Sequence, residues 1–106
     1  MNPDGLWTFR YVLGGQNFSM IGTFHGSRLT GGNSWYYYSG TFEMIDGTLM
    51  STIQGTHYSG ETDPALGGLK QFTLEMRAKL GDNVMQGTAT IVGLPLEVPF
   101  TAKKVA

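Results

Sequence analysis

The stretch Gly31-Gly32-Asn33-Ser34-Trp35-Tyr36-Tyr37-Tyr38-Ser39-Gly40-Thr41-Phe42-Glu43 decides the fold of this chain. Its four consecutive aromatic residues cannot share one side of a β-strand, because successive side chains point to opposite faces. The stretch therefore predicts a strand that places aromatic rings both in a core and on the outside. The first four residues predict a tight turn ahead of this strand, because glycine and asparagine tolerate positive φ angles.

The two faces of this strand, formed by its even and its odd positions, differ in polarity. Its even positions continue as an apolar face, so we expect Tyr36, Tyr38 and Phe42 to point into the core. Its odd positions begin aromatic and end polar, so we expect Trp35 and Tyr37 on the outside as an interaction surface. A partner would then have aromatic rings to contact.

The rest of the chain repeats the same alternation of apolar and polar residues. It predicts strands over residues 6–13, 17–24, 28–30, 48–58, 70–80, 84–92 and 94–104, with short turns between most of them and no helical periodicity. Consecutive strands with short connections favour a meander, and closing it removes exposed edges. We therefore predict an all-β fold, a small antiparallel up-and-down β-barrel of seven or eight strands, with residues 1–106 as a single domain.

Three local features add detail to this prediction. A bulge at Ser39-Gly40 is an alternative that would shift the phase of the aromatic strand. Pro95 and Pro99 share one parity, so we expect the last strand to pair fully on only one side. Residues 59–68 form the longest predicted connection and are the expected place for a specific contact.

The inward positions of the predicted strands mix large and small residues. Gly22, Gly55, Gly87 and Ala89 either make room for bulky neighbours or leave a cavity. A filled core and a barrel that holds a small apolar ligand are both consistent with this mixture. The large residues expected in the interior are Trp7, Phe9, Met20, Tyr36, Tyr38, Phe42, Phe72, Met76, Met85 and Phe100.

Composition restricts the possible functions. The 106-residue chain has no cysteine, so neither a disulfide framework nor a thiolate metal site can form. Its formal net charge of −1 disfavours nucleic-acid binding, which requires an excess of basic residues. No stretch approaches the ~18 apolar residues that a membrane span needs, and the start lacks the pattern of a secretory signal. We expect a cytoplasmic protein with no nucleic-acid or membrane partner.

Catalytic and metal-binding patterns are weak. His25 and His57 have no second ligand at a metal-binding spacing, so we predict no metal site and no cofactor. His57 with Glu61 and Asp63 can be drawn as an acid/base trio, but polar loop residues are usually only solvated. Outward aromatic rings could also stack nucleic-acid bases, but such platforms come with a basic groove and only Arg28 lies nearby in the sequence. We therefore predict that the protein is not an enzyme.

Several motifs resemble those of the GrlR-like family, negative regulators of type III secretion with a lipocalin-like β-barrel. They are Gly5-Leu6-Trp7, the Gly31-Gly32-Asn33 segment, the block Tyr36-Tyr37-Tyr38-x-Gly40-Thr41-Phe42, Asp46-Gly47 and Gly87-x-Ala89. The similarity follows nearly the whole chain in order. It implies a cytoplasmic, dimer-forming bacterial barrel that acts by binding, with room for an apolar ligand.

The chain departs from this family at one functional loop. In the founding regulator an acidic Glu-Asp-Glu-Asp loop contacts a transcriptional activator, whereas the corresponding segment here is Glu43-Met44-Ile45-Asp46-Gly47. We predict a non-enzymatic binding or regulatory module that acts through protein contacts as a homodimer. The alternative is a carrier or sensor of a small hydrophobic ligand inside the barrel.

Overall fold

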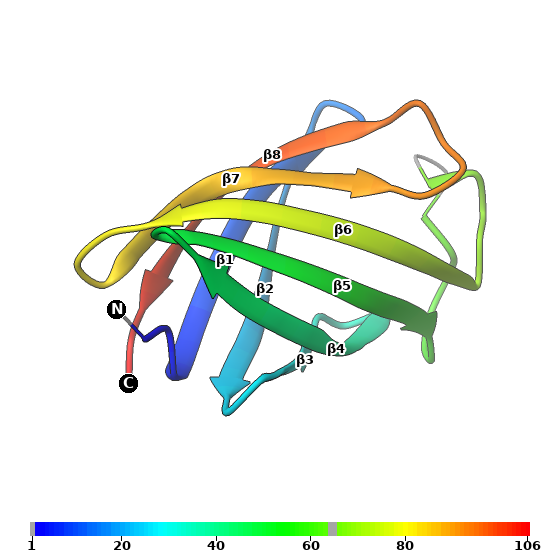
Figure 1. The fold of residues 1–106 in the computed structure, drawn as a ribbon. Coiled ribbons are helices and arrows are strands. Elements are labelled where there is room, and N and C mark those ends of the chain that lie inside the picture. Colours follow the sequence, from blue (N-terminus) through cyan, green and yellow to red (C-terminus); the bar gives the residue numbers. More distant parts are fainter. Residues whose placement is uncertain (1, 64–65) are drawn as a thin grey trace.

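The computed structural model describes residues 2–63 and 66–106, which form a closed antiparallel barrel of eight strands (Figure 1). Each strand pairs with its neighbours in the sequence, and the last strand pairs with the first. Within the described residues no helix has the length and apolarity needed to cross a membrane. The strands are β1 (Gly5–Leu13), β2 (Gln16–His25), β3 (Arg28–Gly32), β4 (Tyr36–Ile45), β5 (Thr48–His57), β6 (Gln71–Leu80), β7 (Val84–Ile91) and β8 (Glu97–Lys104).

The aromatic strand β4 is regular throughout. Tyr36, Tyr38 and Phe42 are buried, as predicted, and the pairing with β5 continues without interruption from Tyr36 to Ile45. The alternative of a bulge at Ser39-Gly40 is therefore wrong. Gly40 serves close strand packing instead, because a Cβ at this position would collide with the carbonyl oxygen of Thr52.

The Gly-Gly pair ahead of β4 has a different role from the predicted one. Gly31 and Gly32 belong to β3, and neither has a positive φ angle. A Cβ at Gly31 would collide with the carbonyl oxygen of Ile21 in β2, so glycine is required here by close strand packing and not by a turn. Asn33 makes the turn, since its Oδ1 accepts hydrogen bonds from the backbone N–H groups of Trp35 and Tyr36, both at 2.9 Å.

The last strand closes the barrel. β8 begins at Glu97 and not at residue 94, because residues 92–95 turn the chain through a hydrogen bond from Leu94 N to the Ile91 carbonyl at 3.1 Å. It pairs with β7 from Glu97 to Lys103 but with β1 only from Phe100 onward. The prediction of full pairing on one side is confirmed, since the β1 pairing ends one residue after Pro99.

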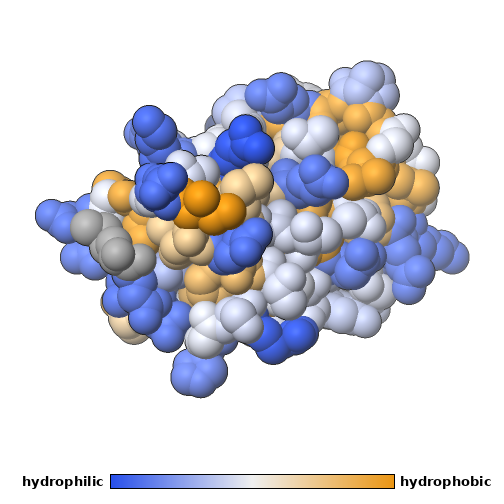
Figure 2. All heavy atoms as spheres, in the orientation of Figure 1, coloured by the Kyte–Doolittle hydropathy of each residue, from blue (hydrophilic) through white to orange (hydrophobic). Residues whose placement is uncertain are grey.

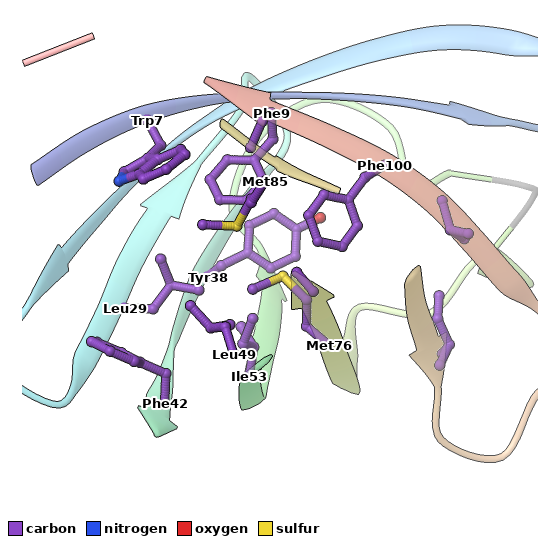
Figure 3. Close-up of a cluster of buried hydrophobic side chains, with 14 of the residues drawn as sticks. Trp7, Phe9, Leu29, Tyr38, Phe42, Leu49, Ile53, Met76, Met85 and Phe100 are labelled. Carbon is purple, nitrogen blue, oxygen red and sulfur yellow. The ribbon is translucent and has the colours of Figure 1, made fainter. Parts of the chain in front are cut away.

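The barrel interior contains the predicted large side chains. Nine of the ten expected interior residues are buried, while Met20 is half-buried. The labelled residues in Figure 3 converge on the interior from β1 and from β3 through β8. On the outside, polar and neutral residues cover most of the face in Figure 2, with an apolar patch at the end where Figure 1 draws the β7–β8 turn.

One end of the barrel is sealed by aromatic packing. Trp7 is 1% exposed, and its indole Nε1 donates a hydrogen bond to the Pro3 carbonyl at 2.7 Å. The Trp7 ring lies edge-on to Phe24 at 6.1 Å, and Phe24 lies edge-on to Phe42 at 5.1 Å. Such edge-to-face pairs add about 0.5–1.5 kcal/mol beyond area burial. We call this end the closed end; the open end carries residues 14–15, 33–35, 58–63, 66–70 and 92–96.

Candidate ligand-binding cavity

A cavity of about 80 Å³ lies inside the barrel toward the open end. Its lining is mostly aromatic and aliphatic. Of the ten expected interior residues, seven line the cavity, and the other three, Trp7, Phe42 and Met85, do not. The aromatic lining residues are Phe9, Tyr11, Phe18, Trp35, Tyr36, Tyr38, Phe72 and Phe100.

The small inward residues explain how the rings and the space coexist. The Phe72 ring lies directly on Gly55, because a Cβ there would stand 2.5 Å from Cζ of Phe72. Phe9 lies on Gly22 in the same way, with its Cε1 2.8 Å from a Cβ at that position. Ala89 lines the cavity itself. The two glycines therefore make room for rings, and Ala89 leaves space open.

Trp35 lies at the rim of the cavity. It is 40% exposed, as expected, but it precedes β4 and lies in the turn made by Asn33. Its ring lies edge-on to Phe18 at 6.1 Å, and a Cβ at Gly60 would stand 2.6 Å from its Cδ1 atom. The indole therefore spans from β2 to the loop between β5 and β6.

Tyr37 has different surroundings. It points outward with 49% exposure, and its ring packs against Tyr58 at a centroid distance of 6.2 Å. The Tyr58 hydroxyl donates a hydrogen bond to the Asn33 carbonyl at 2.5 Å. Trp35 lines the cavity whereas Tyr37 does not, so the expected surface of these two residues divides into a cavity rim and an outer face.

Tyrosine hydroxyls supply most of the polar groups of the cavity. The Tyr36 hydroxyl donates to the Leu69 carbonyl at 2.9 Å and accepts from the backbone N–H of Asp63 at 3.1 Å, which ties the β5–β6 loop to β4. The Asn33 side-chain amide donates to the Tyr11 hydroxyl at 3.4 Å. The hydroxyls of Tyr11 and Tyr38 lie close enough that each affects the pKa of the other.

Burial raises the pKa values of two of these tyrosines, Tyr11 and Tyr38. Desolvation raises the pKa of Tyr38 well above its ordinary value of 10, and the nearby hydroxyls of Tyr11 and Tyr36 raise it further. Desolvation also raises the pKa of Tyr11, although the hydrogen bond from Asn33 lowers it in part. Both hydroxyls therefore keep their protons to a higher pH than an exposed tyrosine does.

The cavity has one charged group among its described lining residues, the carboxylate of Asp63. No lysine, arginine or histidine belongs to that set. Desolvated anions require a partner of opposite charge, so this composition disfavours an anionic ligand.

His57, the histidine of the possible acid/base trio with Glu61 and Asp63, makes contacts that hold the fold together. His57 Nε2 donates a hydrogen bond to the Gly60 carbonyl at 2.9 Å, and its ring lies edge-on to Tyr36 at 5.4 Å. These contacts attach the β5–β6 loop to the barrel. Within residues 2–63 and 66–106, no group of three histidine, aspartate or glutamate side chains could hold a metal ion. Catalysis by the trio stays a hypothesis.

Sequence reasoning missed part of the lining. Tyr11 and Phe18 line the cavity. Both lie on the apolar faces of their predicted strands, and this alternation could have identified them as inward-facing residues. Asn33 was interpreted only as a turn residue and Asp63 only as a catalytic candidate. Leu66, which is 4% exposed, lies in a loop where no periodicity marks it as buried.

No family model matches the chain, and no curated protein matches it. The resemblance to the GrlR-like family therefore stays a prediction. The function has to be inferred from the geometry of the cavity and of the outer face.

Proposed function

We propose that the protein binds a small apolar molecule in the cavity at the open end of the barrel. The observation that carries this proposal is an aromatic-lined space inside the barrel with few polar groups. Ligand sites are typically concave and mostly apolar, with a small number of placed polar groups that fix orientation. The cavity has this composition, since tyrosine hydroxyls, Asn33 and Asp63 are its polar members.

The size of the cavity limits the ligand. An apolar cavity of roughly 150 Å³ in another protein binds benzene. The cavity here has about 80 Å³, so a single ring fits only with a small adjustment of the rim. Trp35 and Phe18 are the side chains that can give way, because Trp35 is 40% exposed and Phe18 is half-buried.

Ligand binding would also complete the packing of the interior. Side chains that face a void lose dispersion contacts on that side, at ~0.1–0.2 kcal/mol for each atom pair. Phe72, Met76 and Ala89 face the space from β6 and β7. An apolar molecule in contact with them restores those contacts without desolvating any charge.

A cavity-filling variant tests the proposal. We expect toluene to bind the wild-type protein saturably in a calorimetric titration. In Ala89→Leu the larger side chain fills part of the cavity, so the affinity should fall roughly tenfold or more, equivalent to ~1.4 kcal/mol. Thr88→Leu is the matched control, because Thr88 faces the outside of the same strand.

Two results would contradict this proposal. One is the absence of saturable toluene binding to the wild-type protein. The other is equal toluene affinity in Ala89→Leu and wild type, since the molecule would then bind elsewhere. Native mass spectrometry after gentle purification adds an independent readout, because a bound natural ligand would appear as added mass.

A second candidate function is protein binding through the outer face of β2, β3 and β4. Ile21 is 54% exposed, Tyr37 49% and Tyr58 56%. Ile21 and Tyr37 stand in one row on either side of Gly32, and Ile21, Gly32 and Tyr58 border a shallow hollow. Exposed aromatic and aliphatic side chains gathered in this way mark interaction surfaces. The homodimer implied by the GrlR-like resemblance would use this face.

The solution mass tests this second candidate. A wild-type dimer that becomes a monomer in Tyr37→Glu/Tyr58→Glu would support it. Thr52→Glu is the control, since Thr52 is exposed on the outer face of β5 away from this patch. A monomeric wild type, or a dimer that persists in the double variant, would exclude this face as a dimer interface.

A further inference from the structure

The strand pairing of the barrel wall is incomplete at the open end. β2 pairs with β1 over nearly its whole length, but it pairs with β3 only from Ile21 onward (Figure 1). The reason is that β3 ends at Gly32, opposite Ile21, where Asn33 turns the chain into β4. Residues 16–20 of β2 therefore have a neighbouring strand on one side alone. We call their unpaired side the seam.

Side chains close the seam where the strand pairing stops. Phe18 from β2 and Trp35 from the turn before β4 lie edge-on to each other with ring centroids 6.1 Å apart, and both line the cavity. The indole of Trp35 also reaches Gly60, where an added Cβ would stand 2.6 Å from its Cδ1 atom. Trp35 therefore bridges β2 and the β5–β6 loop, and it separates the cavity from solvent at the seam.

The main chain of Trp35 is held in place, whereas its side chain has room to move. The Trp35 backbone N–H donates to Oδ1 of Asn33 at 2.9 Å, and the Trp35 carbonyl accepts from the backbone N–H of Tyr58, also at 2.9 Å. The side chain is 40% exposed, so it can rotate toward solvent. This rotation opens the seam without breaking either backbone hydrogen bond.

Other routes into the cavity are closed more firmly. Residues 97–99 of β8 also lack pairing with β1, but the inward side chains beside that break, Leu13 and Val98, are only 6% and 7% exposed. The β5–β6 loop is tied down by the Tyr36 hydroxyl, which bonds two of its main-chain groups. Moving this loop away breaks those hydrogen bonds, and parting two paired strands breaks a ladder of them. The Trp35 side chain is therefore the easiest part of the wall to displace.

We propose that small apolar molecules enter and leave the cavity sideways through the seam, and that the Trp35 side chain is the gate of this route. The inference rests on the proposed function, because it concerns access to the same cavity. Binding that waits for a conformational change has a lower association rate constant than binding to an open site. Trp35 therefore controls how fast a ligand is exchanged, in addition to contacting it when bound.

The association rate constant of toluene tests this inference. Methyl NMR line shapes of Met20 and Met76, which line the cavity, give the dissociation rate constant, and calorimetry gives the dissociation constant. We expect Trp35→Ala to raise the association rate constant roughly tenfold or more. Loss of a contact with bound toluene would raise only the dissociation rate constant. Trp35→Leu gives the same comparison if Trp35→Ala does not fold. Val12→Ala is the control, because Val12 is 54% exposed at the open end of β1 and does not line the cavity.

The outcomes separate this inference from the proposed function. If toluene does not bind wild type, the proposed function itself fails. If toluene binds but the Trp35 variants leave the association rate constant unchanged, the cavity is a binding site and the seam is not its entrance. Tyr36→Phe tests the competing route, because it removes the hydroxyl that ties down the β5–β6 loop. A larger rise in Tyr36→Phe than in Trp35→Ala would place the entrance at that loop and overturn the inference.

Discussion

Replacing Gly55 with alanine should push the Phe72 ring into the cavity. A Cβ at position 55 would lie 2.5, 2.8 and 3.0 Å from three atoms of that ring, whereas carbon atoms normally pack at about 3.5–4.0 Å. The ring therefore has to retreat by roughly 1 Å. Tyr36 and Tyr38 flank it at centroid distances of 5.5 and 6.0 Å, so the cavity is the space available to it.

The magnitude follows from this forced movement. Overpacking of a well-ordered core costs about 1–3 kcal/mol, which for a domain of this size lowers Tm by roughly 5–20 °C. The displaced ring also occupies ligand space, so we expect toluene affinity to fall roughly tenfold. Urea unfolding and calorimetric titration measure the two effects separately.

Gly81→Ala is the control for Gly55→Ala. Gly81 also lacks a positive φ angle, and the nearest atom to an added Cβ is Cγ2 of Val84 at 3.5 Å, an ordinary contact. This variant should be as stable as wild type or more stable by ~0.4–1 kcal/mol. If Gly55→Ala matched wild type in both stability and toluene affinity, Phe72 would not lie between Gly55 and the cavity.

Three further predictions concern the closed end, the turn before β4 and the buried tyrosines. Trp7→Phe removes the donor to the Pro3 carbonyl and should lower the free energy of unfolding by about 1–3 kcal/mol in chemical denaturation, so an unchanged value would exclude a role for this bond. Asn33→Ala removes the acceptor of two backbone hydrogen bonds at 2.9 Å and should cost about 1–3 kcal/mol, with a red shift of tryptophan emission; unchanged emission would mean that the turn forms without it. Because burial raises the pKa values of Tyr11 and Tyr38 in the folded state, the unfolded chain loses these protons first, and stability should fall as pH rises above about 10. Ionisation of all five tyrosines near pH 10 with the fold intact, followed by ultraviolet absorption, would contradict this.

The barrel itself could be predicted because alternation is a strong signal in regular strands. Tyr36, Tyr38 and Phe42 were placed in the core from parity alone, and the uninterrupted β4–β5 pairing preserves that parity. The hairpin at Asp46-Gly47 was also predictable, and both residues have the positive φ angles that such a turn requires.

The features that were not predicted depend on contacts between distant parts of the chain. Gly31 lies in a sequence pattern typical of a turn. Glycine is required there, however, because the carbonyl of Ile21 in the neighbouring strand leaves no room for a Cβ. Trp35 was placed by alternation, but the hydrogen bonds of Asn33 start β4 one residue later, so its ring lies at the cavity rim. Parity assigns a face to a residue only within a strand, and the start of a strand is set by such side-chain contacts.

Ligand location inside the cavity can be followed directly at methionine methyl groups. Met20 and Met76 line the cavity, whereas Met50 borders a hollow on the outer face of β5. In a toluene titration monitored by methyl NMR, the account predicts saturable shifts at Met20 and Met76 with a common dissociation constant and none at Met50. Unchanged Met20 and Met76 signals, or shifts confined to Met50, would contradict the claim that this barrel binds small apolar molecules in its interior.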